Sequence, residues 1–237
     1  MKKRMPLPLL TVLALLGAEA LLSLGTPLVW LLSISAGEVF GYVVLVIFES
    51  AGLLLLLSVL GAAFGALAGG MRTPLLLLSG AVGAHLVGMI LSLVWQALFF
   101  RQTISERELL LLLGSSLDNA ILPLFAAFLI TYAYILKKAP VCEVRSMRDR
   151  STAPVRAAIL SSSLIFAYRF IGQLISAIRF VNESFGFLFL KPGEKAMLFL
   201  DFIPVLAVSA GGYFLMLLAW RLYQRLAEAR GTKEKTP

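Results

Sequence analysis

The chain has 237 residues, of which 59% are hydrophobic and only 14% are charged. Soluble globular proteins carry about 25% charged residues, so this composition cannot build a water-exposed surface. It excludes a soluble enzyme, a disordered chain and a nucleic-acid-binding domain. The formal net charge is +8, from 21 Lys and Arg against 13 Asp and Glu. The single cysteine, Cys142, excludes an intramolecular disulfide and a zinc site built from cysteines.

Six apolar stretches are each long enough to cross the hydrocarbon core, which needs about 20 helical residues. Backbone amides in lipid have no water to bond, so stretches this aliphatic must be helices, and the lack of alternating polarity argues against an outer-membrane barrel. The sequence therefore predicts an all-α polytopic membrane helix bundle, with one integral membrane domain over 1–237. The six predicted transmembrane helices cover residues 7–34, 41–68, 75–100, 109–136, 157–180 and 196–220.

The first apolar stretch also fits a secretory signal peptide. The basic residues Lys2–Arg4 precede it, and Ala18–Ala20 fits a cleavage site. The apolar run continues from Leu21 to Ser35, however, and cleavage would leave a segment too short to span comfortably. We therefore expect 7–34 to remain as an uncleaved first helix.

Basic residues near the helix ends predict the orientation, because cytoplasmic loops are enriched in Lys and Arg. Six spans place both termini on one side of the membrane. The loops on the opposite side hold five basic residues, Arg101, Arg107, Arg179, Lys191 and Lys195. The side of the termini holds fifteen, which are Lys2, Lys3, Arg4, Arg72, Lys137, Lys138, Arg145, Arg148, Arg150, Arg156, Arg221, Arg225, Arg230, Lys233 and Lys235. Both termini, with the tail 221–237, are predicted to be cytoplasmic in a multi-pass protein of the cytoplasmic (inner) membrane, and no nucleic acid is needed to explain the charge.

Small residues at every fourth position predict close helix packing, because they leave a flat groove on one helix face. One row ends the second span and the other begins the third: Gly61, Gly65 and Gly69, then Gly80, Ala84 and Gly88. We expect the two rows to face each other in a tight antiparallel hairpin. The alternative interpretation is a site at which the backbone approaches a ligand.

The loop 137–156 is the longest predicted cytoplasmic connection and is bracketed by Pro140 and Pro154. Its basic residues are interpreted as a tether that follows the positive-inside rule. The alternatives are binding to lipid phosphates or to a cytoplasmic protein partner.

The outer loop around 182–195 is apolar and aromatic, in contrast to the basic cytoplasmic loop. Its apolar residues Phe185, Phe187, Leu188, Phe189 and Leu190 are followed by Lys191, Pro192 and Gly193. Aromatic and basic residues together are typical of the membrane interface, so this loop is predicted to be interfacial or re-entrant.

A weak 3+3 inverted repeat is a further hypothesis, since inverted three-helix halves are typical of transporters. The first and fourth spans share a Leu-Gly pair, an acid and a proline: Gly17, Glu19 and Pro27 against Gly114, Asp118 and Pro123. In a sequence this rich in leucine such matches also arise by chance.

Ionisable residues inside the spans carry the most information about function, because each costs about 2.5–3.5 kcal/mol at the bilayer centre. A rise of about 1.5 Å per residue places five of them, on five different helices, near one level. These five are Glu19, Glu49, His85, Asp118 and Arg169, while Asp201 lies closer to the outer face. The fifth span also carries a polar stripe of Ser162, Arg169, Gln173 and Ser176.

The acids within the spans outnumber the bases. Arg169 and His85 can neutralise at most two carboxylates, and a buried carboxylate with no cation takes up a proton. The remaining acids have three interpretations: protonated hydrogen-bond donors within the bundle, proton carriers, or ligands for a cation. The structural alternative is that acids near helix ends reach water or pair with another subunit.

The sequence lacks the motifs of common enzyme sites. A lone histidine, His85, excludes H-E-x-x-H chemistry and a metal site with two histidines. There is no G-x-G dinucleotide loop, no Walker A lysine and no G-x-S-x-G elbow. We therefore predict no enzyme activity, no catalytic residue, no metal and no cofactor.

The leading functional hypothesis is a transport protein, a permease or carrier for a small solute or ion, with proton coupling as one option. Its polar site near the bilayer midplane would use Glu19, Glu49, Asp118 and Arg169, with His85 and Gln173 as second choices. The alternative is a non-catalytic integral membrane subunit or assembly factor of a larger membrane complex. The expected partners are the lipid bilayer, a small solute or proton, and a membrane or cytoplasmic protein bound at 137–156.

Overall fold

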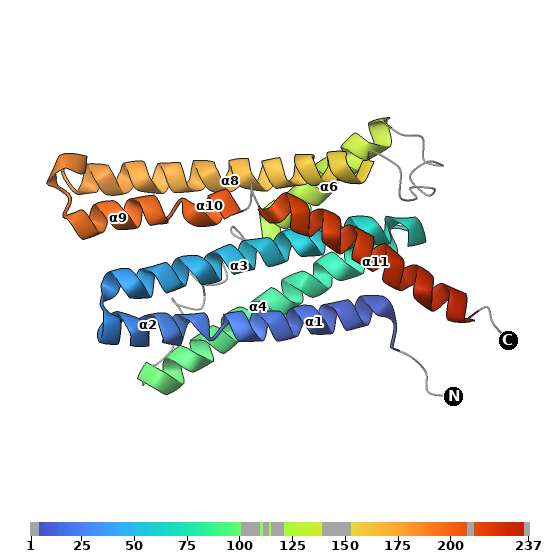
Figure 1. The fold of residues 1–237 in the computed structure, drawn as a ribbon, viewed down its shortest axis with the longest axis horizontal. Coiled ribbons are helices and arrows are strands. Elements are labelled where there is room, and N and C mark those ends of the chain that lie inside the picture. Colours follow the sequence, from blue (N-terminus) through green and yellow to red (C-terminus); the bar gives the residue numbers. More distant parts are fainter. Residues whose placement is uncertain are drawn as a thin grey trace.

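The computed structural model describes residues 5–100, 110, 114, 121–138, 153–207 and 211–234. Within these residues every regular element is a helix, which confirms the all-α prediction for this part of the chain. The helices run along one long axis as an elongated bundle (Figure 1). The start of α1 (Leu7–Leu22) and the end of α11 (Tyr213–Glu234) lie at the same end of that bundle (Figure 1).

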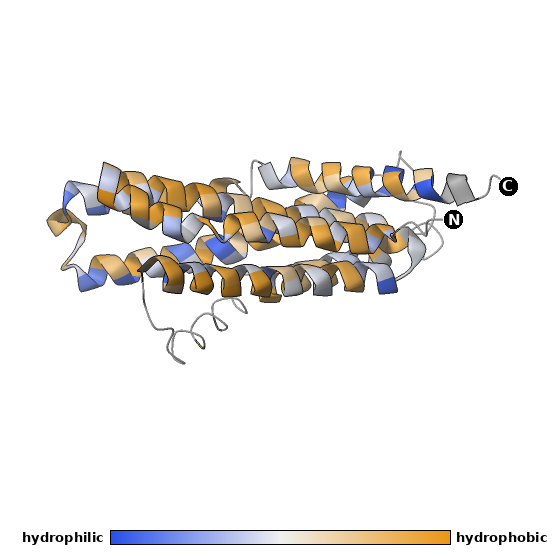
Figure 2. Cartoon of the chain, turned by 90° about the horizontal axis from the view of Figure 1, so that it is seen from below, coloured by the Kyte–Doolittle hydropathy of each residue, from blue (hydrophilic) through white to orange (hydrophobic). Residues whose placement is uncertain are grey.

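Four helical stretches of the described chain are long and apolar enough to cross a membrane. They are Leu7–Ala36, Glu38–Gly65, Arg72–Phe99 and Pro154–Glu183. Apolar residues colour most of the length of these helices, and hydrophilic residues lie mainly toward the ends (Figure 2). The chain therefore has the helices of a membrane-embedded protein.

The first apolar stretch is divided into α1 and α2 (Gly25–Ala36) by a turn at Ser23 and Leu24. Pro27 explains the break, because it has no N–H to donate to the carbonyl of Ser23, four residues earlier. The predicted helix over 7–34 is therefore present as one apolar stretch with an interruption near its middle.

Helices α3 (Glu38–Gly65) and α4 (Arg72–Phe100) are continuous and are linked by the 3-10 helix η1 (Ala66–Gly69). Gly37, at φ 98°, makes the sharp reversal from α2 into α3, a conformation that glycine adopts without steric cost. Helix α3 packs against α2, α4 and α11 and is therefore the centre of the bundle.

Most of the described part of the fourth predicted span lies in its second half, as α6 (Leu122–Lys138). The apolar part of this helix, Leu122–Ile135, is too short by itself to cross a membrane. Helix α6 packs mainly against α8 (Ala153–Glu183), the longest helix in the described part of the chain.

Helix α8 ends in a Schellman arrangement. The N–H of Gly186 donates to the carbonyl of Val181, and the N–H of Phe185 donates to that of Asn182. Phe185 occupies the left-handed position, at φ 60°, where a residue with a Cβ costs about 1–2 kcal/mol. The short 3-10 helix η3 (Phe187–Phe189) follows directly.

The sixth predicted span, 196–220, is not one helix. It is divided into α9 (Pro192–Leu200), α10 (Ile203–Ala207) and the start of α11, which continues to Glu234. Pro204 explains the break after α9, because it has no N–H to donate to the carbonyl of Leu200. A helix therefore continues through most of the segment that the sequence assigned to a tail.

The best-packed core lies where α3, α6 and α11 meet. The ring of Phe64 lies 5.0 Å from that of Phe128 and 5.7 Å from that of Trp220, measured between centroids. All three side chains are almost fully buried. Aromatic pairs at such spacings add about 0.5–1.5 kcal/mol beyond the burial of their area.

The first row of small residues packs against α11, which corrects the predicted pairing of the two rows. A Cβ at Gly61 would lie 2.2 Å from the backbone oxygen of Met216, and a Cβ at Gly65 would lie 2.8 Å from that of Trp220. Gly69 faces open space. The row therefore lets the α3 and α11 backbones touch, as such rows do in membrane helices.

The second row packs against α1. A Cβ at Gly80 would lie 2.4 Å from Cγ2 of Val12, and a Cβ at Gly88 would lie 3.0 Å from Oε2 of Glu19. Ala84, between them, is buried. Four of the five glycines in the two rows therefore lie against another helix, and Gly69 is the exception. The two rows have different neighbours, because α3 packs its row against α11 and α4 packs its row against α1.

Candidate functional site

Glu19 of α1 and His85 of α4 meet across a helix interface. Nδ1 of His85 lies 3.3 Å from Oε1 of Glu19, and the side chains of His85 and Glu19 are 24% and 13% exposed. A neutral imidazole can donate one hydrogen bond to the carboxylate, and a protonated one adds an ion pair. The contact therefore joins α1 to α4 through two ionisable side chains.

Packing and backbone geometry both position this pair. Gly88 lies one turn beyond His85, and its missing side chain leaves the space that the Glu19 carboxylate occupies. The N–H of Ser23 donates to the backbone carbonyl of Glu19 at 2.9 Å, directly before the interruption between α1 and α2. The pair therefore lies one helical turn from the break in the first apolar stretch.

Glu49 and Arg169, two further predicted site residues, lie on helices that contact each other, α3 and α8. Glu49 is exposed on α3, and Arg169 is partly buried on α8.

Tyr42 and Asp201 form a second polar contact between helices, in which the Tyr42 hydroxyl donates a hydrogen bond to Oδ1 of Asp201. Asp201 caps the end of α9, at the interruption before α10. The bond therefore joins the broken sixth stretch to the N-terminal part of α3, far away in the sequence. The Glu19–His85 and Tyr42–Asp201 contacts thus both lie beside an interrupted apolar helix.

Gln173 is partly buried on α8, one turn beyond Arg169, so the two residues share a face. Asp118 lies outside the described residues, as do 139–152 of the basic loop. The interpretations of Asp118 and of that loop therefore stay predictions.

The polar residues are arranged in pairs between helices. Glu19 pairs with His85 and Asp201 with Tyr42, and the described residues contain no group of three or more His, Cys, Asp or Glu that could hold a metal ion. Arg169 and His85 are the two bases within the predicted spans, away from the span ends, that can neutralise an acid. The structure adds a neutral partner, the Tyr42 hydroxyl.

Two polar contacts had no clear signal in the sequence. Tyr42 lies in a run of aliphatic residues, and nothing in its spacing points to Asp201, 159 residues away. Thr131 of α6 and Ser161 of α8 share a hydrogen bond of 2.8 Å with both side chains fully buried. Serine and threonine are common in membrane helices, so these two did not stand out from the others.

Comparison with protein-family models, with curated proteins and with solved structures finds no match for this chain.

Proposed function

We propose that this protein is a multi-pass membrane transport protein that carries a small solute or ion along a polar pathway near the bilayer midplane. The observation that supports the proposal is the Glu19–His85 contact beside the interrupted first apolar stretch. Ionisable side chains within membrane helices are costly and are kept mainly where they serve a pathway for ions, protons or substrates.

The interruptions add to this argument. Broken helices in transporters place free backbone groups beside charged side chains at the binding site. Here Pro27 and Pro204 each remove the donor that a backbone carbonyl would otherwise bond, and Glu19 and Asp201 lie within one turn of the two breaks. Carboxylates and carbonyl oxygens together are ligands for a proton or a hard cation.

The proposal assigns six crossings and a cytoplasmic location to both termini. The crossings are α1–α2, α3, α4, the stretch ending in α6, α8 and the stretch from α9 into α11. Its support is the basic residues near the termini and the fact that α1 begins and α11 ends at the same end of the bundle (Figure 1). The cytoplasmic membrane and the 3+3 repeat stay predictions.

The test is electrical recording from proteoliposomes adsorbed on a solid-supported membrane. Concentration jumps of inorganic ions, amino acids, sugars, nucleosides and organic acids, and jumps of pH, would be applied to the wild type, to Glu19→Gln and to Glu38→Gln. Glu38→Gln is the matched control, because Glu38 is an exposed acid in the first turn of α3. We expect at least one jump to give a current that Glu19→Gln abolishes and Glu38→Gln retains. Absence of any wild-type current, or an unchanged current in Glu19→Gln, would contradict the proposal.

The second candidate function is that of a non-catalytic subunit of a membrane complex, and α8 is the observation that favours it. In the most apolar 18-residue stretch of α8 only 6% of the residues are buried within the chain. The corresponding share is 33% in α3 and in α4. If the protein is such a subunit, the face of α8 that carries Arg169 and Gln173 would pack against a helix of the partner protein. Arg169→Gln would then reduce the yield of an assembled complex in size-exclusion chromatography, and no solute jump would give a current.

A further inference from the structure

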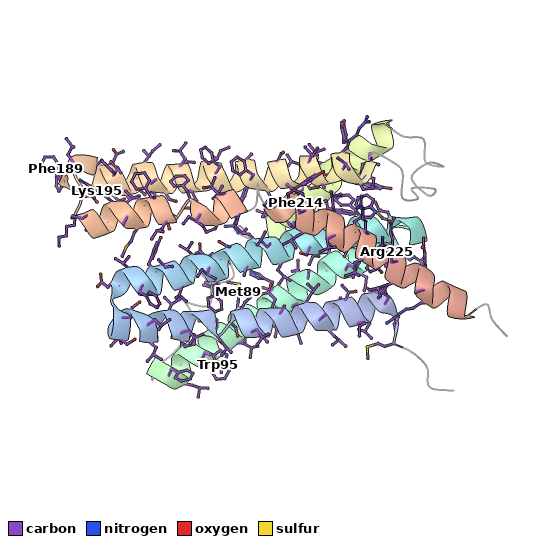
Figure 3. All side chains as sticks on the ribbon, viewed as in Figure 1. Met89, Trp95, Phe189, Lys195, Phe214 and Arg225 are labelled. Atoms are coloured by element: carbon purple, nitrogen blue, oxygen red, sulfur yellow. The ribbon has the colours of Figure 1, made fainter. Side chains whose placement is uncertain are left out.

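The turn between α8 and α9 carries a dense group of exposed apolar side chains. Phe185 is 90% exposed, Leu188 86% and Phe189 78%, and Phe187 beside them is 42% exposed. These four residues, here called the apolar tip, lie at the end of the bundle opposite the start of α1 (Figures 1 and 3). A contiguous apolar patch of this kind marks an interaction surface.

The conformation of the apolar tip is fixed from both sides. The Schellman hydrogen bonds end α8, and on the other side the N–H of Lys191 donates to the Glu194 carboxylate at 2.7 Å, which begins α9. Leu190, directly after the tip, is buried against the bundle. The tip residues are therefore held outward by ordered structure on both sides.

Cationic side chains accompany the apolar tip. Nζ of Lys195 lies 5.1 Å from the centre of the Phe187 ring, and Lys191 is exposed next to the tip. Figure 3 shows Phe189 and Lys195 at the same end of the bundle. Large apolar side chains flanked by lysines match the boundary between lipid acyl chains and phosphate headgroups.

The length of α8 brings the tip to that boundary. Its 31 residues extend about 46 Å at 1.5 Å each, whereas the hydrocarbon core is about 30 Å thick. The far end of α8 therefore reaches the headgroup layer. The apolar tip is also continuous with the largely uncovered face of α8, itself a candidate membrane span.

We propose that the apolar tip inserts into the lipid interface on the side of the membrane opposite the termini. Phe185, Leu188 and Phe189 contact the upper acyl chains, and Lys191 and Lys195 lie among the lipid phosphates. The tip thereby anchors the α8–α9 turn to the bilayer. This inference depends on the membrane helices and not on transport, so the two proposals fail separately.

The test places a fluorescent probe on the apolar tip of the full-length protein. Cys142→Ser removes the single native cysteine, and Leu188→Cys is labelled with nitrobenzoxadiazole and reconstituted into vesicles of phosphatidylcholine with phosphatidylglycerol. Gly69→Cys, labelled in the same way, is the matched control, because Gly69 is exposed in the α3–α4 link and a Cβ there meets no atom within 4 Å.

We expect nitroxide-labelled lipids to quench the Leu188→Cys probe, and aqueous iodide to quench it about threefold less than the Gly69→Cys probe. Phe189→Cys, at a second exposed position, should behave like Leu188→Cys. Strong quenching by iodide without quenching by lipid would show a tip in water and overturn the inference. Protection from both quenchers would show a tip covered by protein, which overturns it equally.

Discussion

The contact between α3 and α11 and the outward face of α8 differ in how a helix meets its surroundings. At the first, Gly61 and Gly65 bring two backbones into contact, and Trp220 is 1% exposed. On the second, Ile171, Ile175 and Ile178 are all more than half exposed. Close approach of two backbones therefore holds α3 to α11, whereas the outward face of α8 is left uncovered by the described part of the chain. The two regions should respond differently to added volume, and the following predictions measure that difference.

The largest effect is expected for Gly61→Leu. Its side chain would have to occupy the position of the Met216 backbone, which cannot move without separating α11 from α3. Overpacking costs about 1–3 kcal/mol where side chains can adjust, and more where backbone is in the way. We expect little or no monodisperse protein in size-exclusion chromatography. Gly52→Leu is the matched control on the same helix, where a Cβ meets no atom within 4 Å. Equal recovery of the two variants would show that the α3–α11 contact is not close.

A smaller effect is expected for Gly88→Ala. The new methyl group would lie 3.0 Å from Oε2 and 3.1 Å from Cβ of Glu19, so α1 must shift by a few tenths of an ångström. The expected loss of stability is about 1–2 kcal/mol. Gly83→Ala, on α4 in open space, should gain up to about 1 kcal/mol from helix propensity. Thermal unfolding followed by tryptophan fluorescence measures both, and a melting temperature for Gly88→Ala at or above that of Gly83→Ala would be inconsistent with this packing.

A still smaller effect is expected for Tyr42→Phe, which removes the hydroxyl that donates to Asp201. Hydrogen bonds between membrane helices contribute about 0.6 kcal/mol on average and up to about 1.7 kcal/mol. A double-mutant cycle with Asp201→Asn, measured by thermal unfolding, should give a coupling energy in that range. A coupling energy of zero would mean that the two side chains do not interact in the bilayer.

The smallest effect is expected for Ala167→Leu on α8. Ala167 is exposed, alanine and leucine are both strong helix formers, and surface substitutions change stability by about 0.5 kcal/mol or less. The melting temperature and the transport current should both stay at the wild-type value. Loss of an assembled complex in this variant would instead identify the α8 face as a subunit interface.

The sequence was sufficient for the class of fold and for the faces that pack closely. Long aliphatic runs can only be helices in lipid, and small residues at every fourth position favour the close approach of another helix, which the structure shows at Gly61, Gly65, Gly80 and Gly88 but not at Gly69. The predicted partner helices of those faces were wrong, because the spacing of glycines along α3 carries no information about whether α4 or α11 lies against Gly61. The same limit hid the bond between Tyr42 and Asp201, which depends on the path of the chain.

The helix interruptions were missed for a different reason. Average hydropathy continues across Ser23 and Leu24, so the span over 7–34 was predicted as one helix. The interruptions depend on single residues, since Pro27 and Pro204 each lack the N–H that would donate to the carbonyl four residues earlier. An average over a whole span does not detect the loss of one hydrogen bond. The contact of Glu19 with His85 agrees with the need of a buried charge for a partner, but a count of charges does not say which base meets which acid.

The most direct test of the account is native mass spectrometry of the tagged protein, extracted from its native membrane in a gentle detergent. If the polar pairs belong to a pathway within one chain, the protein is a monomer or a homo-oligomer. A bound ion or small solute should then be retained in the wild type and lost in Glu19→Gln. The contradicting result has two parts. Every complex would contain a second protein in fixed stoichiometry, and the Glu19→Gln complex would keep both that protein and the same small-molecule content.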